Sequence, residues 1–94
     1  MDFGEAIKAL KAGKRLARKG WNGDKMFIYR ESGTLITPDK IRNATLAESI
    51  PDAQKYLHIN PHVDMKSANG SIVVGWLASQ TDMLADDWEV VGRD

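Results

Sequence analysis

The stretch Arg18-Lys19-Gly20-Trp21-Asn22-Gly23 sets the organisation of this chain. It places two cations, one large aromatic ring and two glycines within a single short segment. Asn-Gly is the favoured pair for a two-residue type I′ turn, so the stretch predicts a hairpin with Trp21 at a strand end. Glycine also lets a ligand approach the backbone closely. Two interpretations follow: a nucleotide site with stacking surface, cations and free N–H groups, or a tight hairpin whose tryptophan fills the core.

An amphipathic helix is predicted before this hairpin. Asp2 and Glu5 have the spacing of a capping box, and apolar residues recur from Phe3 at helical intervals. Gly13 is well placed to end the helix. The pattern predicts a helix over residues 3–12 and a short strand over residues 14–19 with Leu16 facing inward.

The middle of the chain carries weaker signals. Residues 26–29 are apolar on both faces of a predicted strand, and residues 35–36 extend a third strand. Thr37-Pro38 has the form of a helix start, with residues 41–46 continuing it. Ser49-Ile50-Pro51-Asp52 offers a second start ahead of residues 53–57. Short helical or irregular pieces are therefore expected here.

The last third of the chain is more regular. Polar and apolar residues alternate over 62–66, Asn69-Gly70 predicts a turn, and residues 71–76 return as a partner strand. Ser79 and Asp82 have capping-box spacing before a short helix, and residues 88–91 form a final strand with Trp88 in the core. The order predicts an α+β fold: a small antiparallel sheet of about five strands with an N-terminal helix and a short C-terminal helix. The length fits a single domain, 1–94.

Composition narrows the classes of partner. Lys plus Arg and Asp plus Glu number 13 each, so no nucleic-acid partner is expected, because such binding normally needs a basic excess. The basic residues gather in the first fifth of the chain, which leaves a small anionic ligand a local positive region. Cysteine is absent, which excludes disulfides and thiolate metal sites and suits the cytoplasm. The longest apolar run, residues 72–78, is too short to span a bilayer, and no membrane partner is expected.

Two blocks of the sequence resemble one family. They are FGEAIKALKAGKRLARKGWNG, from Phe3 to Gly23, and PHVDMKSANGSIVVGWLASQTDMLADDWEVV, from Pro61 to Val91. Together they are similar to the Thoeris anti-defense proteins of the second type, which are small phage and prophage proteins. Residues 30–60 match that family less well.

The resemblance implies a sponge and not an enzyme. Such proteins bind and hold the cyclic ADP-ribose isomer made by a Thoeris TIR protein, without cleaving it, in the cytoplasm of the infected host. The resemblance further implies homo-oligomers, expected to be tetramers, with nucleotide pockets between protomers. It implies that some members also hold cyclic dinucleotides, and it brings no cofactor, no metal and no catalytic residue.

A cyclic ADP-ribose needs three kinds of contact. Its adenine needs a stacking partner, for which Trp21 and Trp76 are the best candidates. Its pyrophosphate needs charge-assisted donors, and its riboses need acceptors. A helix start at residues 79–81 adds hydroxyl and N–H groups. The predicted ligand-binding residues are Arg18, Trp21, Asn22, Gly23, Met26, Asp64, Lys66, Trp76, Ser79, Gln80, Thr81 and Asp82.

Each of these residues also has an ordinary structural explanation. Trp76 on an alternating strand fits the core, Arg18 and Lys66 fit a solvated surface, and Asp82 fits a helix cap. Asp64 is less easily explained, because aspartate is depleted in strands.

Two other functions stay open. A small cyclic-nucleotide hydrolase would use His62 and Asp64, which a strand points to one face, but no nucleophile motif accompanies them. The spacing of His58 and His62 suits a helical metal pair, yet Pro61 opposes a helix there. A module that blocks a host defence protein directly would need an exposed apolar patch, for which residues 26–29 are candidates. The same residues would serve equally as a homo-oligomer interface.

Overall fold

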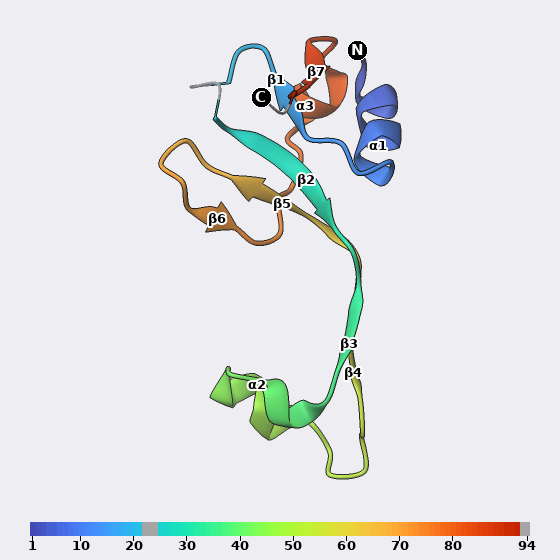
Figure 1. The fold of residues 1–94 in the computed structure, drawn as a ribbon, viewed down its shortest axis with the longest axis vertical. Helices are drawn as coiled ribbons and strands as arrows, with labels where there is room; N and C mark the ends of the chain where they lie inside the picture. The colour runs from blue at the N-terminus through green and yellow to red at the C-terminus, as the bar shows by residue number, and fades with distance from the viewer. Residues whose placement is uncertain (22–24, 93–94) are drawn as a thin grey trace. The chain divides into compact units, whose positions relative to one another are not determined.

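The computed structural model describes residues 1–21 and 25–92, and the chain divides into two compact units (Figure 1). We call the first the sheet unit, formed by Met1–Glu31 with His62–Asp94, and the second the arm, formed by Ser32–Pro61. Each unit is described by itself. The single domain 1–94 expected from the sequence stays a prediction.

The sheet unit is built on five antiparallel strands in the order β6-β5-β2-β1-β7. Strand β1 pairs with β2 and β7, and β5 pairs with β2 and β6. This confirms the predicted α+β fold with its five-stranded antiparallel sheet and two helices. The strands are β1 (Leu16–Arg18), β2 (Phe27–Glu31), β5 (His62–Lys66), β6 (Ile72–Val73) and β7 (Trp88–Val90).

Local signals set both helices of this unit. Helix α1 (Phe3–Lys11) begins at the predicted capping box, in which Asp2 Oδ1 accepts from Glu5 N at 2.8 Å and Glu5 Oε1 accepts from Asp2 N at 3.1 Å. It ends where Gly13 takes a φ of +88°, a conformation that glycine reaches without steric cost. Helix α3 (Gln80–Leu84) begins after Ser79, again as predicted.

The hydrophobic core lies between α1 and one face of the sheet. Its buried members include Leu16, Ile28 and Met65 from the strands and Trp88 from β7, with Ala6 and Leu10 from α1. The predictions that Leu16 faces inward and that Trp88 is a core residue are confirmed. Since side chains alternate along a strand, the neighbours of Ile28 and Met65 lie on the outer face of the sheet.

Two predictions for the sheet unit were wrong. The return strand expected over residues 71–76 is only Ile72–Val73, because the chain bends at Gly75, whose φ is +82°. The two-residue hairpin is also wrong, since β1 ends at Arg18 and β2 begins only at Phe27. Trp21 N donates to Arg18 O at 3.1 Å, so the chain already turns just after β1. The predicted turn residues Asn22 and Gly23 lie outside the described residues.

The arm is a two-stranded antiparallel ribbon with two short helical pieces. Strand β3 (Thr34–Ile36) pairs with β4 (Leu57–Ile59), so the expected third strand at residues 35–36 is confirmed. Thr37-Pro38 does start a helix, but only the 3₁₀ turn η1 (Pro38–Lys40). The chain is extended at Ile41 and restarts as α2 (Ala44–Ser49).

The helix start predicted at residues 49–52 was wrong. Ser49 is the last residue of α2, and the cap of that helix is Asn43, whose Oδ1 accepts from Leu46 N at 3.0 Å. Ser49 Oγ donates back to the carbonyl of Leu46 at 2.6 Å, so its side chain bonds within α2 and does not cap a following helix. Leu57 begins a strand where a helix was expected to end.

Candidate functional site

Three tryptophans from separate segments form a cluster on the core side of the sheet. The ring centroids lie 5.4 Å apart for Trp21 and Trp88, 6.1 Å for Trp76 and Trp88, and 6.1 Å for Trp21 and Trp76, all in edge-to-face arrangements. Trp88 is buried, whereas Trp21 and Trp76 are partly exposed beside it. The two outer rings therefore pack against a buried third ring and keep part of their surface exposed.

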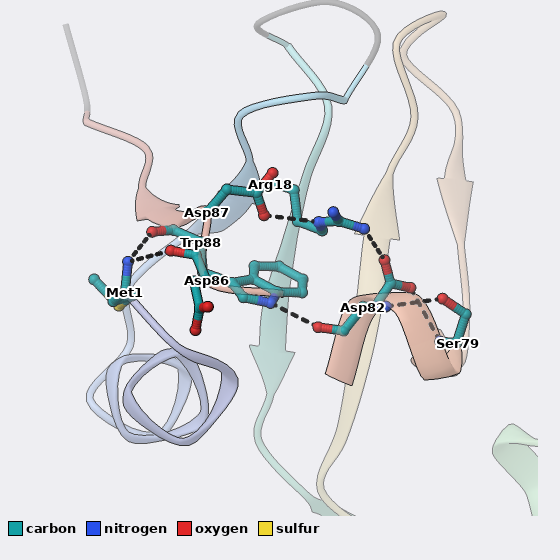
Figure 2. Close-up of polar contacts among 7 residues, drawn as sticks. All are labelled: Met1, Arg18, Ser79, Asp82, Asp86, Asp87 and Trp88. Atoms are coloured by element: carbon teal, nitrogen blue, oxygen red, sulfur yellow. Dashed lines mark hydrogen bonds and ion pairs between the residues drawn. The ribbon is translucent and has the colours of Figure 1, made fainter. Parts of the chain in front are cut away.

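Hydrogen bonds hold the Trp88 ring and the backbone that carries Trp76. Trp88 Nε1 donates to the carbonyl of Asp82 at 2.9 Å, as Figure 2 shows, and Trp76 N donates to Val63 O at 2.7 Å. The Met1 amino group donates to the carbonyls of Asp86 and Trp88, at 3.2 and 2.7 Å, which ties the segment before α1 to β7. The cluster is thus held by backbone contacts from the sheet, α3 and the N-terminal segment.

Arg18 lies beside this cluster in a network with two carboxylates. Its Nε donates to Asp87 Oδ1 at 2.9 Å, and its Nη1 donates to Asp82 Oδ1 at 3.0 Å (Figure 2). The hydrogen bonds with Asp87 and Asp82 raise the pKa of Arg18. Asp87 was not predicted from the sequence to take part in the site. Its position next to Trp88 could have indicated it, because Trp88 pairs with Arg18 between β1 and β7.

The network makes Arg18 a positioning residue for Asp82 and Asp87. One guanidinium faces two carboxylates, so this network of three side chains carries one net negative charge. Arg18 is predicted from the sequence to bind a pyrophosphate. A pyrophosphate would have to compete with both carboxylates for the N–H donors of this guanidinium. A phosphate bound near the tryptophans needs further cations.

The start of α3 is filled by its own capping box. Ser79 Oγ accepts from Asp82 N, and Asp82 Oδ2 accepts from Ser79 N, each at 3.0 Å. Gln80 and Thr81 follow in the exposed first turn. The ordinary interpretation of Asp82 as a helix cap is therefore correct, and these two N–H groups are already used.

Asp64 and Lys66 lie on the other face of the sheet. Asp64 is buried, accepts from Gly75 N at 2.8 Å, and has its Oδ1 3.2 Å from His62 Nε2. Lys66 Nζ donates to Lys25 O at 3.3 Å and lies 5.7 Å from the centre of the Phe27 ring. Asp64 thus fixes the bend at Gly75 that leads the chain to Trp76.

The predicted site residues therefore fall into two groups. The structure brings Arg18, Trp21, Met26, Trp76, Ser79 and Asp82 together on the core side, with Gln80 and Thr81 in the same helix α3. It places Asp64 and Lys66 on the outer face. Met26 contributes packing against the core cluster. Asn22 and Gly23 lie outside the described residues, so their assignment stays a prediction.

Residues 1–21 and 25–92 hold no group of three or more His, Asp or Glu side chains that could ligate a metal ion. No helix in that part of the chain is long and apolar enough to cross a bilayer. The pairing of His62 with Asp64 on one strand face is confirmed, but Asp64 is also engaged by Gly75.

Two comparisons with known proteins agree. The family model for the Thoeris anti-defense 2-like domain matches residues 1–91. A protein of Bacillus phage SP01 named "Thoeris anti-defense 2" is 35% identical over 91 residues, which covers 97% of this chain and 94% of that relative. The match includes the arm, where the sequence resemblance was weaker.

Proposed function

Because this chain belongs to the Thoeris anti-defense 2-like family, we propose that it serves anti-defense by holding a signalling nucleotide. The nucleotide is of the cyclic ADP-ribose type, made by a Thoeris TIR protein, and the chain binds it without cleaving it in the host cytoplasm. The observation that carries this proposal is the pair of partly exposed tryptophans, Trp21 and Trp76, braced on buried Trp88.

The tryptophan pair supplies the adenine contact. Stacking of a base on an aromatic side chain contributes about 1–3 kcal/mol. A sponge whose dissociation constant is about 1 nM needs a binding free energy of about −12 kcal/mol. One aromatic stacking surface on a single small protomer is insufficient for that. Enclosure between protomers removes more of the ligand surface from water. The proposal therefore includes a homo-oligomer, expected to be a tetramer.

Exposed apolar residues next to the cluster support such enclosure. Val74, Leu77 and Leu84 are 74%, 90% and 79% exposed; the first two lie within two residues of Trp76, and Leu84 is the last residue of α3. Isolated large apolar residues are common on surfaces, but three highly exposed ones in the segments that carry Trp76 and Asp82 favour an interface. We call Val74, Leu77 and Leu84 the α3 patch.

The phosphates need cations from outside the Arg18 network. Lys19 is exposed directly after Arg18, and Lys66 lies on the outer face of the sheet. In the proposed assembly, cations of a facing protomer complete the pyrophosphate contacts. This explains how a site with a net negative charge in one copy holds an anionic ligand in the assembly.

The test is calorimetry of the full chain against cyclic ADP-ribose isomers and cyclic dinucleotides, comparing wild type with Trp21→Ala and Trp21→Phe. Loss of one stacking contact predicts roughly 5- to 150-fold weaker binding for Trp21→Ala, with partial retention in Trp21→Phe. The assembly mass should not change. Equal affinity in Trp21→Ala and wild type would remove Trp21 from the site.

A second measurement separates a sponge from a hydrolase. Ligand released from the loaded protein by denaturation should have the mass of the intact cyclic nucleotide, whereas a hydrolase releases product. The α3 patch also favours one alternative, a module that blocks a host protein directly. That function predicts no heat of binding in calorimetric titrations with any nucleotide of the panel.

A further inference from the structure

Asp64 is buried in a strand, which is an unusual place for a carboxylate. It is 3% exposed, and it is the one buried charged residue in the part of the chain that the structure describes. Burying a charge is costly unless hydrogen bonds compensate it, and aspartate is depleted in strands. Asp64 Oδ1 has two partners: Gly75 N donates to it at 2.8 Å, and His62 Nε2 lies 3.2 Å away. The carboxylate is therefore placed to hold the backbone of Gly75.

The chain shifts its register against β5 by one residue after β6. Val73 pairs with Met65, so an unbroken strand would place residue 75 opposite Val63. Instead, Trp76 N donates to Val63 O at 2.7 Å. One extra residue therefore lies between these two contacts, which is the arrangement of a β-bulge.

The extra residue changes the face of the sheet on which Trp76 lies. In the register of β6, residue 76 would lie opposite His62, whose side chain is on the outer face. Directly opposite residues share a face, and a shift of one residue moves a side chain to the other face. Trp76 lies opposite Val63 instead, and both residues pack against the core. The bulge thus brings the Trp76 ring into the tryptophan cluster.

Gly75 and Asp64 stabilise this bulge in different ways. Gly75 has a φ of +82°, an outlier conformation for β-branched residues. A Cβ at Gly75 would meet no atom within 4 Å, so the glycine is needed for its backbone conformation and not for space. Val63 O accepts from Trp76 N, and the Asp64 carboxylate supplies the acceptor for Gly75 N. The backbone N–H that the bulge takes out of the strand pairing is therefore satisfied by a side chain.

We propose that Asp64 and Gly75 are positioning residues for Trp76: they hold the bulge that puts this ring in the tryptophan cluster, and neither contacts the nucleotide. The inference rests on the proposed function for its effect on binding. It gives Asp64 a role different from the ribose acceptor expected from the sequence. Nucleotide retention then depends on the register of the edge strand β6 as well as on the rings themselves.

The experiment combines fluorine NMR of the full chain, labelled with fluorotryptophan, with calorimetry of the unlabelled chain. Fluorine NMR reports the surroundings of each indole ring, and the resonance of Trp76 is assigned with the variant Trp76→Phe. The calorimetric probe is the cyclic ADP-ribose isomer that wild type binds most tightly.

Two variants remove the bulge, and two preserve it. Gly75→Val favours a regular strand, because valine prefers strands and opposes a positive φ, and Asp64→Leu removes the acceptor of Gly75 N. Both should move the Trp76 resonance and weaken binding roughly 5- to 150-fold, the loss of one stacking contact. Gly75→Asn and Asp64→Asn should keep both readings near wild type. Asparagine tolerates a positive φ, and its side-chain oxygen still accepts a hydrogen bond.

The matched control is Gly70→Val, in the turn of the same hairpin. Gly70 has a φ of +94°, and a Cβ there would also meet no atom within 4 Å. The substitution therefore introduces the same backbone conflict away from the bulge. Gly70→Val should lower the free energy of unfolding as Gly75→Val does, while the Trp76 resonance and the affinity stay at their wild-type values. If Asp64→Leu does not fold, the two Gly75 variants and this control carry the test.

Three results would overturn the inference. An unmoved Trp76 resonance in Gly75→Val would show that the ring keeps its place without the bulge. Equal displacement in Gly70→Val would show that any strain in the hairpin moves the ring. Weaker binding by Asp64→Asn with an unmoved resonance would mean that Asp64 contacts the nucleotide itself. The two proposals fail separately: displaced resonances together with no binding by wild type refute the sponge and leave the positioning of Trp76 standing.

Discussion

Replacing Trp88 with phenylalanine tests the physical basis of the candidate site. Trp88 is 1% exposed and packs against Phe3 with ring centroids 5.6 Å apart, as well as against the two outer tryptophans. Its Nε1 donates at 2.9 Å to the carbonyl of Asp82 in α3. The phenyl ring keeps part of the packing but removes both the outer part of the indole and the hydrogen bond.

The loss of stability is worked from these contacts. Removing two buried carbons at about 0.8 kcal/mol each costs about 1.6 kcal/mol. Leaving the Asp82 carbonyl without its donor costs about 1 kcal/mol more, at the low end because Asp82 is only partly buried. The expected loss is about 3 kcal/mol from an unfolding free energy of about 5–14 kcal/mol for a chain of this length. The melting temperature should fall by roughly 12–24 °C.

The assay is urea unfolding followed by far-ultraviolet circular dichroism, with all variants at one protein concentration because association adds to stability. The matched control is Trp76→Phe, the same chemical change at a half-buried member of the cluster, with an expected loss of about 1 kcal/mol. The slope of the unfolding free energy against urea concentration should stay unchanged in both variants. A loss for Trp88→Phe no larger than that for Trp76→Phe would refute the assignment of Trp88 as the support of the cluster.

Acid should weaken the fold through the Arg18 network, and a glycine substitution should weaken α1. Arg18 lowers the pKa of Asp87; burial acts to raise the pKa of Asp82, but bonds from Ser79 and Arg18 outweigh it and leave that pKa lowered. Both carboxylates therefore stabilise the fold above pH 3.8, and the contribution is lost as pH falls through their folded-state pKa values. The free energy of unfolding should be larger for wild type than for Arg18→Gln at pH 7, and this difference should disappear in acid. A difference that does not change with pH would contradict the network. Gly13→Ala should cost about 1 kcal/mol in the same urea assay, because φ is +88° there, whereas Gly20→Ala, with no positive φ and open space around it, is the neutral control.

Local chemistry made much of the fold readable from the sequence. Asp2 with Glu5 and Ser79 with Asp82 act over a few residues, so spacing alone located both helices of the sheet unit. The alternation over 62–66 likewise identified β5, which directs Met65 into the core. The errors arose where a local pattern did not show which role a residue takes: Ser49 bonds back into α2 and does not cap a new helix, and the chain bends at Gly75 shortly after β6.

The sequence by itself determined which residue types were at hand for a nucleotide: tryptophans, cations and hydroxyls. Only the tertiary structure determined which groups these residues contact. Arg18 meets carboxylates 64 and 69 residues away because β1 and β7 pair in one register, which no local pattern encodes. The tertiary fold also brings three distant tryptophans into edge-to-face contact and leaves two of them partly exposed.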